Sequence, residues 1–204
     1  PVDLIFMLLA PEAAGADPVE FRLRHLADER AIAVVEAVAE RMGWNETAPA
    51  PGHGRGIAFA QYKNIKAYVA VGMELEVTDA AEVRLHHAVI AADAGQVVDP
   101  VGLAAQLEGG LLQAASWTLY EEVRFDRDGI TSCDWESYPI LRFDNIPEID
   151  TVLMDRPGEP FLGVGEAPPG PTAGAIANAI RDATGLRLYR LPFTPDAIRQ
   201  AALK

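Results

Sequence analysis

The chain has 204 residues, of which 50% are hydrophobic and 23% are charged, a composition typical of a globular protein that can bury a core. Its formal net charge is −13, and the acidic residues are spread along the chain, which argues against a nucleic-acid-binding protein. A single cysteine, Cys133, excludes an internal disulfide framework and any metal site or iron–sulfur cluster built from cysteines of this chain alone.

The N-terminal residues 2–10 form an apolar run that contains one charged residue, Asp3. This run is far shorter than the ~20 residues that a membrane-spanning helix needs. It also lacks the basic region with which a signal peptide begins. We expect it to form an edge strand or a helix that is buried against another segment, which could belong to another chain.

Two helices are predicted to follow. Asp17 and Pro18 are suited to the start of a short helix over residues 19–26, and Asp28-Glu29 to the start of a second helix. Gly43 is the expected C-terminal stop of this second helix. Its apolar residues recur with helical spacing and are Ile32, Val35, Val38, Ala39 and Met42.

Residues 45–54 contain Pro49, Pro51 and two glycines, which is typical of a loop. This loop is the best candidate for a boundary within the chain. We therefore expect a helical linker or partner-docking segment at residues 1–50 and a second domain at residues 51–204.

Three strands are predicted next, over residues 56–62, 67–78 and 82–92, because these stretches have the residue types and alternation of strands. The alternation is clearest from Val71 onward. A turn at residues 78–81 is expected to join the last two strands into an antiparallel hairpin.

The chain has four histidines: His25, His53, His86 and His87. They are too scattered in the sequence to indicate a zinc site, and no His-Glu-x-x-His pattern is present. His86 and His87 are adjacent within a predicted strand, where successive side chains point to opposite faces. We therefore expect the two rings to serve packing or to lie at the surface, and not to chelate one metal ion together.

A long helix is predicted over residues 101–123, with Asp99 as its N-cap and Pro100 at its start. Its middle carries Gln106 and the pair Gly109-Gly110, and each glycine costs about 1 kcal/mol in a helix. A glycine pair at this position indicates the close approach of a ligand or another backbone, or else a break in the helix.

The remaining elements are shorter. Residues 126–129, with the sequence Asp-Arg-Asp-Gly, predict a hairpin turn, and residues 149–154 predict a further strand. A short strand is expected at residues 186–191, and a terminal helix that begins at Thr194-Pro195. The chain is therefore predicted to have an α+β fold, in which a mixed sheet or hairpins pack against long helices.

The stretch over residues 161–171 combines glycines, a carboxylate and prolines. Gly163 and Gly165 can take positive φ and let another group approach the backbone closely. The prolines that follow Glu166 stiffen the backbone. We therefore expect Glu166 to be held on a short, rigid and poorly shielded turn.

A helix is predicted to begin at Gly170-Pro171-Thr172 and to run to about Thr184, with Gly185 as its stop. Alanines on its apolar face allow close packing against a flat surface. The expected buried face consists of Ala173, Ile176, Ala177, Ile180 and Ala183.

No Ser-His-Asp signature, nucleophile elbow or P-loop is present, and Gly163-Val-Gly165 is only half of a dinucleotide-binding fingerprint. By pattern alone, Glu166 is open to two interpretations, an exposed loop carboxylate or a functional group. Gln106 is equally open, because an amide on an apolar helix usually serves helix packing.

A resemblance to a known family bears on these alternatives. Gly163-Val-Gly-Glu166, together with the helix sequence at residues 171–179, looks like the C-terminal signature of the molybdenum hydroxylases, the xanthine dehydrogenase/aldehyde oxidase family. The stretches at residues 93–100 and 106–110 resemble the same family, and most of all its isoquinoline oxidoreductase-like branch. Further agreement lies at residues 15–26, 115–122, 134–140 and 191–195.

This resemblance implies the C-terminal molybdopterin-binding domain of an oxidoreductase that oxidises an aldehyde or hydroxylates an N-heteroaromatic substrate with water-derived oxygen. Glu166 matches the family's general base beside molybdenum, and a rigid turn suits this role because the reaction needs position more than reach. Gln106 matches a glutamine that hydrogen-bonds the pterin cofactor. The backbone of Gly163, Val164 and Gly165 is expected near the same cofactor, and no side chain of this chain is expected to ligate the metal.

The resemblance also implies cofactors and partners. Bacterial members typically use molybdopterin cytosine dinucleotide, and 2Fe-2S clusters and FAD or haem would belong to partner subunits. The chain lacks the family's upstream glycine-rich loop and middle segments, so we expect the rest of the molybdenum subunit to be a separate chain. We further expect a small 2Fe-2S subunit, a flavin or cytochrome electron acceptor, and no activity of this chain alone. The location in a bacterial cytoplasm or periplasm is left open.

Two alternatives stand beside an active molybdenum hydroxylase component. The first is a catalytically silent structural or assembly subunit of the same complex, which would keep the fold without turnover. The second is a small-molecule-binding domain that uses residues 163–171 and the following helix N-terminus as an anion site.

Overall fold

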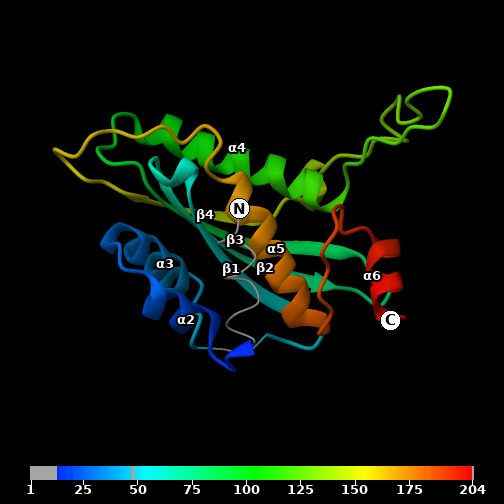
Figure 1. Cartoon of the computed structure of the whole chain (residues 1–204), viewed down its shortest axis with the longest axis horizontal. Coiled ribbons are helices and arrows are strands. Elements are labelled where there is room, and N and C mark those ends of the chain that lie inside the picture. Colours follow the sequence, from blue (N-terminus) through cyan, green and yellow to red (C-terminus); the bar gives the residue numbers. More distant parts are fainter. Residues whose placement is uncertain (1–12, 47–48, 204) are drawn as a thin grey trace.

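One mixed sheet lies at the centre of the computed structural model, which describes residues 13–46 and 49–203 (Figure 1). Its strand order is β1-β2-β3-β4, with antiparallel β1/β2 and β2/β3 pairs and a parallel β3/β4 pair. The strands are β1 (His53–Gln61), β2 (Tyr68–Val77), β3 (Val83–Asp93) and β4 (Glu148–Met154). The predicted α+β class with a mixed sheet is confirmed, whereas the expectation for residues 2–10 lies outside the described residues.

β2 and β3 form the hairpin that the sequence predicted. The backbone N–H of Ala81 donates to the carbonyl oxygen of Thr78 at 2.7 Å, which closes the turn at the expected place. Further along, the register shifts, since Glu74 pairs with His87 but the next residue of β2 pairs with Leu85. His86 is therefore an additional residue on β3, and it forms a β-bulge that interrupts the regular alternation of side chains.

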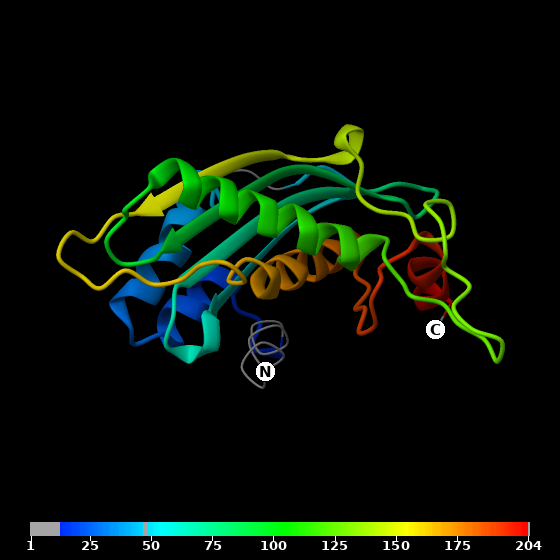
Figure 2. The same cartoon turned by 90° about the horizontal axis from the view of Figure 1, so that it is seen from above.

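Helices cover both faces of the sheet (Figures 1 and 2). One face carries α2 (Pro18–His25) and α3 (Glu29–Arg41), and the other carries α4 (Pro100–Leu119) and α5 (Pro169–Thr184). The first two helices begin at the predicted aspartate N-caps, whose side chains accept backbone hydrogen bonds. α3 packs against the sheet. The division of the chain at residue 50 stays a prediction.

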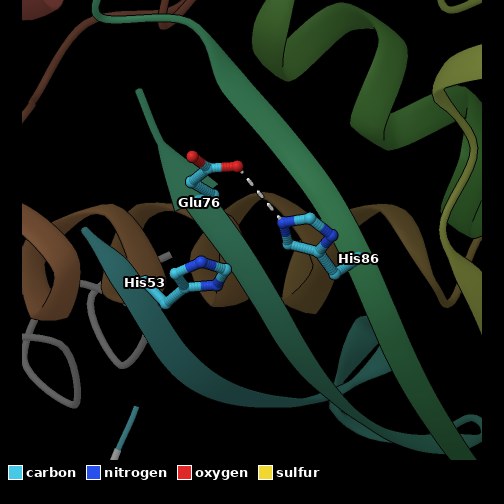
Figure 3. A group of neighbouring side chains, drawn as sticks. All are labelled: His53, Glu76 and His86. Atoms are coloured by element: carbon cyan, nitrogen blue, oxygen red, sulfur yellow. Dashed lines mark ion pairs between the residues drawn. The ribbon is translucent and has the colours of Figure 1, made fainter. Parts of the chain in front are cut away.

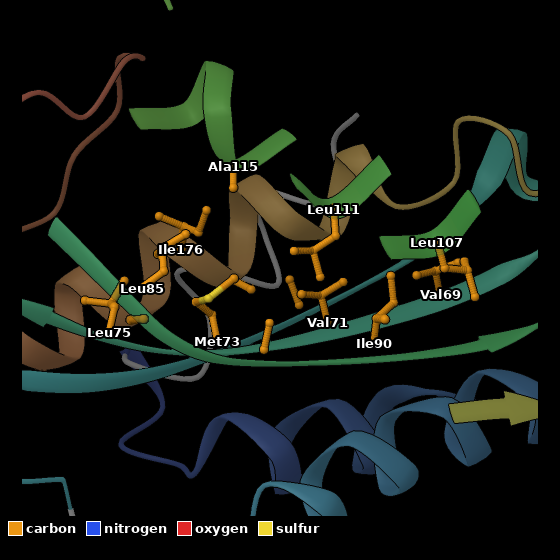
Figure 4. Packing of buried hydrophobic residues seen from close by; sticks show 14 of the residues in the cluster. Val69, Val71, Met73, Leu75, Leu85, Ile90, Leu107, Leu111, Ala115 and Ile176 are labelled. Carbon is orange, nitrogen blue, oxygen red and sulfur yellow. The ribbon is translucent and has the colours of Figure 1, made fainter. Parts of the chain in front are cut away.

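Each face of the sheet has its own hydrophobic cluster. The larger cluster lies between the sheet, α4 and α5 (Figure 4) and includes Val71, Met73, Ile90, Leu111 and Ile176. The smaller one lies under α2 and α3 and includes Val34, Val35, Val38, Ile57 and Val89. Burying one such side chain contributes about 1.5–3 kcal/mol, so the two clusters hold the helices on the sheet.

α5 lies on β1 at close backbone distance, because glycines occupy the contact. A Cβ atom added to Gly56 would lie 2.2 Å from the carbonyl oxygen of Ala175, and one added to Gly54 would lie 2.2 Å from that of Ala179. No side chain fits there. The predicted close packing of the alanine-containing helix on a flat surface is therefore confirmed.

The buried face of α5 is rotated from the predicted one. Ile176 and Ile180 are buried as expected, but Ala173 and its predicted companions at positions 177 and 183 are only half-buried. Ala175 and Ala179 are fully buried in their place. The reason is the glycine contact on β1, which brings the i and i+4 alanines of the helix against the strand backbone.

α4 is continuous, so the Gly109-Gly110 pair does not break it. A Cβ atom at Gly110 would lie 3.0 Å from Pro168 at the start of α5, which identifies the close approach, while one at Gly109 would meet no described atom within 4 Å. The helix ends at Leu119 and not at residue 123 as predicted. Near its end, the carbonyl oxygen of Thr118 accepts a hydrogen bond from the backbone N–H of Phe193 at 2.7 Å. This carbonyl group is therefore bonded to a distant segment of the chain and not to a further turn of the helix.

Residues 120–147 form an arm that extends from the end of α4 away from the body of the molecule (Figures 1 and 2). The arm then returns along α4, where the N–H of Leu141 donates to Oγ of Ser116 at 2.9 Å, before β4 begins. The predicted turn at residues 126–129 is confirmed, because the N–H of Asp126 donates to the carbonyl oxygen of Gly129 at 2.9 Å. Large apolar side chains on the arm are exposed, namely Val123, Phe125, Ile130, Trp135 and Phe143.

The strand predicted at residues 186–191 is wrong, since this segment pairs with no strand in the described part of the chain. Its alternation serves packing on α5 and the core: Leu188 contacts the larger cluster and Arg187 donates to the side-chain oxygen of Asn178 at 3.1 Å. The terminal helix α6 (Pro195–Ala202) begins at Thr194 as predicted. Among the described residues, no helix is both long and apolar enough to cross a membrane.

Candidate functional site

The Gly163–Glu166 stretch lies in the connection between β4 and α5 and forms the predicted turn. The N–H of Ala167 donates to the carbonyl oxygen of Val164 at 3.1 Å, and Ala167 itself is buried. Glu166 is exposed, as expected for a poorly shielded carboxylate. The turn is therefore anchored in the core by Ala167, and it presents the carboxylate of Glu166 to solvent.

Neither glycine of the turn adopts the positive φ that the sequence suggested. Both instead border open space, because a Cβ atom added to Gly163 or Gly165 would meet no atom of the described residues within 4 Å. The peptide groups of this turn are thus uncovered on that side, and a ligand could approach them.

Gln106 meets this turn from α4. Its side-chain Nε2 donates to the carbonyl oxygen of Gly165 at 3.1 Å, directly beside Glu166. The contact depends on the close packing of α4 on the start of α5, where Gly110 faces Pro168. The structure therefore brings together the two motifs that lie about sixty residues apart in the sequence.

Tyr62 completes the arrangement from β1. It opens the short 3-10 helix η1 (Tyr62–Asn64) after this strand, and its hydroxyl donates a hydrogen bond to Oε2 of Glu166. This hydrogen bond to a carboxylate raises the pKa of the Tyr62 hydroxyl above its usual value, and desolvation adds to the effect. The sequence carries no motif around Tyr62, so only the fold reveals this neighbour of Glu166.

The chain that precedes the turn is tied to the end of β3. The N–H of Leu162 donates to the carbonyl oxygen of Ala94 at 2.7 Å, and that of Arg156 donates to the carbonyl oxygen of Gly95 at 3.1 Å. Gly95 has φ of +74°, and a Cβ atom there would lie 2.0 Å from the carbonyl oxygen of Pro160. A residue with a side chain would therefore push the two segments apart.

Asp93 is the buried anchor of this region. Its carboxylate accepts hydrogen bonds from Nε of Arg30 at 3.1 Å, from Nε of Arg156 at 2.9 Å and from the N–H of Gly95 at 3.0 Å. Burial alone would raise the pKa of Asp93, but the hydrogen bonds from Arg30, Gly95 and Arg156 outweigh it and lower the pKa below its usual value. Asp93 thus joins α3, β3 and the loop that leads to Glu166.

The histidines are arranged differently from the prediction. Because of the bulge at His86, the rings of His86 and His87 lie on the same face of the sheet, beside two glutamates of β2. Nε2 of His86 lies 3.6 Å from Oε2 of Glu76, and Nδ1 of His87 lies 4.0 Å from Oε2 of Glu74. The two rings still pair with different groups. His53, which the sequence places far away, stacks on His86 with ring centroids 5.2 Å apart. The expectation that His86 and His87 point to opposite faces is therefore wrong, and so is the expectation that the histidines lie too far apart to share a site, since His53 and His86 are neighbours.

The turn site can hold and move a proton. A carboxylate is exposed, a phenol is directed at it, and an amide fixes the adjacent peptide. The start of α4 and the segments that lead into α4 and into the turn also carry exposed apolar side chains, at Val101, Val98 and Phe161. This combination of an exposed carboxylate, open glycine peptides and apolar side chains is suited to a bound cofactor or substrate.

Comparison with known proteins identifies the family of the chain. Residues 11–147 match the family described as "Molybdopterin cofactor-binding domain". The chain is 43% identical to a component of the nicotinate dehydrogenase of Pseudomonas putida over 93% of this chain, and 34% identical to the beta component of the isoquinoline 1-oxidoreductase of Brevundimonas diminuta over 89% of it. It spans only 17% and 23% of the length of these two relatives.

Solved structures show the same fold. The quinoline 2-oxidoreductase of Pseudomonas putida 86 superposes with a TM-score of 0.63 over 68% of this chain and 19% of that chain, at 23% identity. The aldehyde oxidoreductase of Desulfovibrio gigas superposes with a TM-score of 0.59 over 68% of this chain and 16% of that chain, at 31% identity.

Proposed function

Because the chain belongs to the molybdopterin cofactor-binding domain family, we propose that it forms part of the molybdenum site of a bacterial molybdenum hydroxylase. Within that proposal, it acts on an N-heteroaromatic substrate or an aldehyde. The names of the relatives, nicotinate dehydrogenase, isoquinoline 1-oxidoreductase and aldehyde oxidoreductase, support these two substrate classes.

The observation that carries the proposal is the hydrogen bond from Gln106 to the carbonyl oxygen of Gly165. It joins two separate sequence motifs into one site directly beside Glu166. The residues present suit a pterin cofactor: the amide of Gln106 is exposed, and the peptides of Gly163 and Gly165 border open space. Gln106 and the backbone of Gly163, Val164 and Gly165 would hold the cofactor by hydrogen bonds.

Glu166 would serve as the general base. In the overall reaction the substrate carbon loses a hydrogen and gains an oxygen from water, and two electrons and two protons are released. The cofactor, when bound, supplies the two-electron oxidation. Glu166 would accept the proton that the water-derived oxygen gives up, and a carboxylate held on a rigid turn suits this transfer because the reaction needs position more than reach. Tyr62 would hold the carboxylate in position through its hydroxyl.

Further parts of the complex belong to the same proposal. The cofactor would be molybdopterin cytosine dinucleotide shared with the remaining part of the molybdenum subunit, and electrons would leave through the 2Fe-2S clusters of a small subunit to a flavin or cytochrome acceptor. The relatives are named as subunits, which supports separate partner chains. The exposed apolar side chains at Val98, Val101 and Phe161 support cover by such a partner. A cytoplasmic and a periplasmic location both fit this function.

The test is Glu166→Gln in the assembled enzyme. We expect turnover to fall by about 10²–10⁴-fold, since general base catalysis typically contributes that factor. Molybdenum content and subunit assembly should stay at the wild-type level, because glutamine keeps the size of the side chain. The rate of substrate oxidation and the molybdenum content are both measured on the purified complex.

The matched control is Glu159→Gln, which removes another exposed carboxylate from the same loop and should leave turnover unchanged. Full turnover of the Glu166→Gln enzyme would refute the role of Glu166. The chain would then fit the alternative of a silent structural subunit that only completes the cofactor pocket.

A further inference from the structure

A second cluster of potential ligands lies at the other end of β1. His53 is the first residue of β1 and pairs directly with Glu76 of β2, while His86 comes from β3. Figure 3 shows the three side chains directed toward one another from three neighbouring strands. One nitrogen of each ring and one oxygen of the carboxylate all lie within 4.8 Å of one another.

The β-bulge is what assembles this cluster. In a regular strand, His86 would alternate with His87 and point to the opposite face of the sheet. Here Leu85 pairs with Leu75 and packs in the core, and His86 is the additional residue that follows it. The side chain of His86 therefore lies on the same face as that of His87 and is directed toward Glu76. Bulges are frequent next to functional sites because they redirect a side chain in this way.

We propose that His53, Glu76 and His86 bind one divalent transition-metal ion, with Zn²⁺ as the ion of choice. Two imidazole nitrogens and one carboxylate oxygen form a ligand set typical of zinc sites that keep a position for water. Imidazole ligands select zinc, copper or nickel over magnesium and calcium, which prefer oxygen ligands only.

The separation of the ligand atoms is close to what zinc needs. With metal–ligand distances of about 2.0–2.1 Å and tetrahedral angles, two ligand atoms lie about 3.3 Å apart. Nε2 of His86 and Oε2 of Glu76 are already 3.6 Å apart. The largest separation, at most 4.8 Å, therefore has to shrink by no more than about 1.5 Å, which rotation of partly exposed side chains provides.

The surroundings leave room for the remaining ligand. A cavity of ≈ 200 Å³ is lined by both histidines together with Ala50, Arg55 and Glu74, which is ample space for a coordinated water. Arg84 is a cation that now faces the carboxylate, with Nη1 4.0 Å from Oε2 of Glu76. This guanidinium is more than half exposed, so a metal ion can displace it without leaving a buried charge.

The bound ion would clip β1, β2 and β3 together at the end of the sheet that is remote from Glu166. Its presence should raise the stability of the folded chain, because an ion that binds only the native state shifts the folding equilibrium. At a free concentration 100 times the Kd, the ratio of folded to unfolded chain rises by about 100-fold. This effect is independent of the proposed role of the Glu166 turn.

The experiment uses the full chain in the complex in which it is purified. The protein is treated with a chelator, incubated with excess ZnCl2 and desalted, and zinc is measured by mass spectrometry alongside the thermal unfolding midpoint. Wild type should carry one more zinc per chain than His53→Ala, Glu76→Gln and His86→Ala, and each variant should lose about tenfold or more in zinc affinity. Zinc should raise the midpoint of wild type but not of these three variants, and MgCl2 should raise none.

His87→Ala is the matched control, because it removes the neighbouring ring of the same strand and should keep the zinc. Glu76→Gln keeps the size of the side chain. It therefore tests the site even if circular dichroism shows that a histidine variant is unfolded. Equal zinc content in wild type and Glu76→Gln, or loss of zinc in His87→Ala with its fold intact, would overturn the proposed ligand set.

Discussion

The two polar clusters of this chain lie at opposite ends of one strand. β1 begins with His53, which belongs to the histidine cluster, and it ends just before Tyr62, which contacts Glu166. At roughly 3.3 Å per residue, the two ends are about 30 Å apart. One strand thus connects the proposed proton-accepting site at one end with the proposed metal site at the other.

The clusters differ in how they are built. The Glu166 site is carried by loops and helices, and its main residues come from two short motifs around Gln106 and Gly163–Glu166. The histidine cluster is carried entirely by strands, and each of its residues stands alone in the sequence. Loop sites therefore leave a signature in contiguous residues, whereas strand sites depend on register, which a sequence does not display.

The largest expected effect would break both clusters at once. Gly56→Ala should destabilise the chain by about 3 kcal/mol, because the added methyl group would overlap the backbone of α5 at Ala175. Chemical unfolding measures this change. Gly109→Ala is the control, and it should stabilise by about 1 kcal/mol, since Gly109 is helical and faces open space. If Gly56→Ala has the same unfolding free energy as wild type, β1 and α5 are not packed as described.

A smaller effect should separate the clusters. Asp93→Asn removes the charge that ties Arg30 and Arg156 to the loop before Glu166, so it should weaken that site and spare the histidine cluster. We expect a loss of about 2 kcal/mol in unfolding free energy, below the value for fully buried pairs because both arginines are partly exposed.

The pH dependence of this loss has a definite sign. The pKa of Asp93 is lower in the folded chain than in the unfolded chain, so its ionised form stabilises the fold above the unfolded pKa. That contribution disappears as the pH falls through the folded pKa. The difference between wild type and Asp93→Asn should therefore be largest near neutral pH and shrink below about pH 4. A pH-independent difference would contradict this assignment.

The smallest expected effect concerns Tyr62 alone. Tyr62→Phe removes the hydroxyl that holds Glu166, and the loss of one hydrogen bond to a carboxylate should lower kcat by about tenfold. KM and molybdenum content should remain unchanged, because the ring still packs on the core. Tyr189→Phe is the control, since Tyr189 is exposed. A change in KM without a change in kcat would assign Tyr62 to substrate binding instead of positioning.

Most of the fold followed from local patterns. The helices α2, α3 and α5 were predicted to within one or two residues at each end, the start of α6 was predicted, and the three antiparallel strands were placed within a few residues. The failures have a common cause. Residues 186–191 alternate because they pack on α5, the face of α5 is rotated by the glycines of β1, and α4 stops where another segment bonds its carbonyl. Each depends on contacts with distant residues.

By itself, the sequence determined the elements, the glycine turn and the resemblance that singled out Gln106 and Glu166, because caps, periodicity and short motifs act over a few neighbouring residues. The tertiary structure alone decided that Tyr62 faces Glu166 and that His53 joins Glu76 and His86. The physical reason is that strand register and the single additional residue of the bulge select these neighbours, and both depend on backbone pairing across the whole sheet.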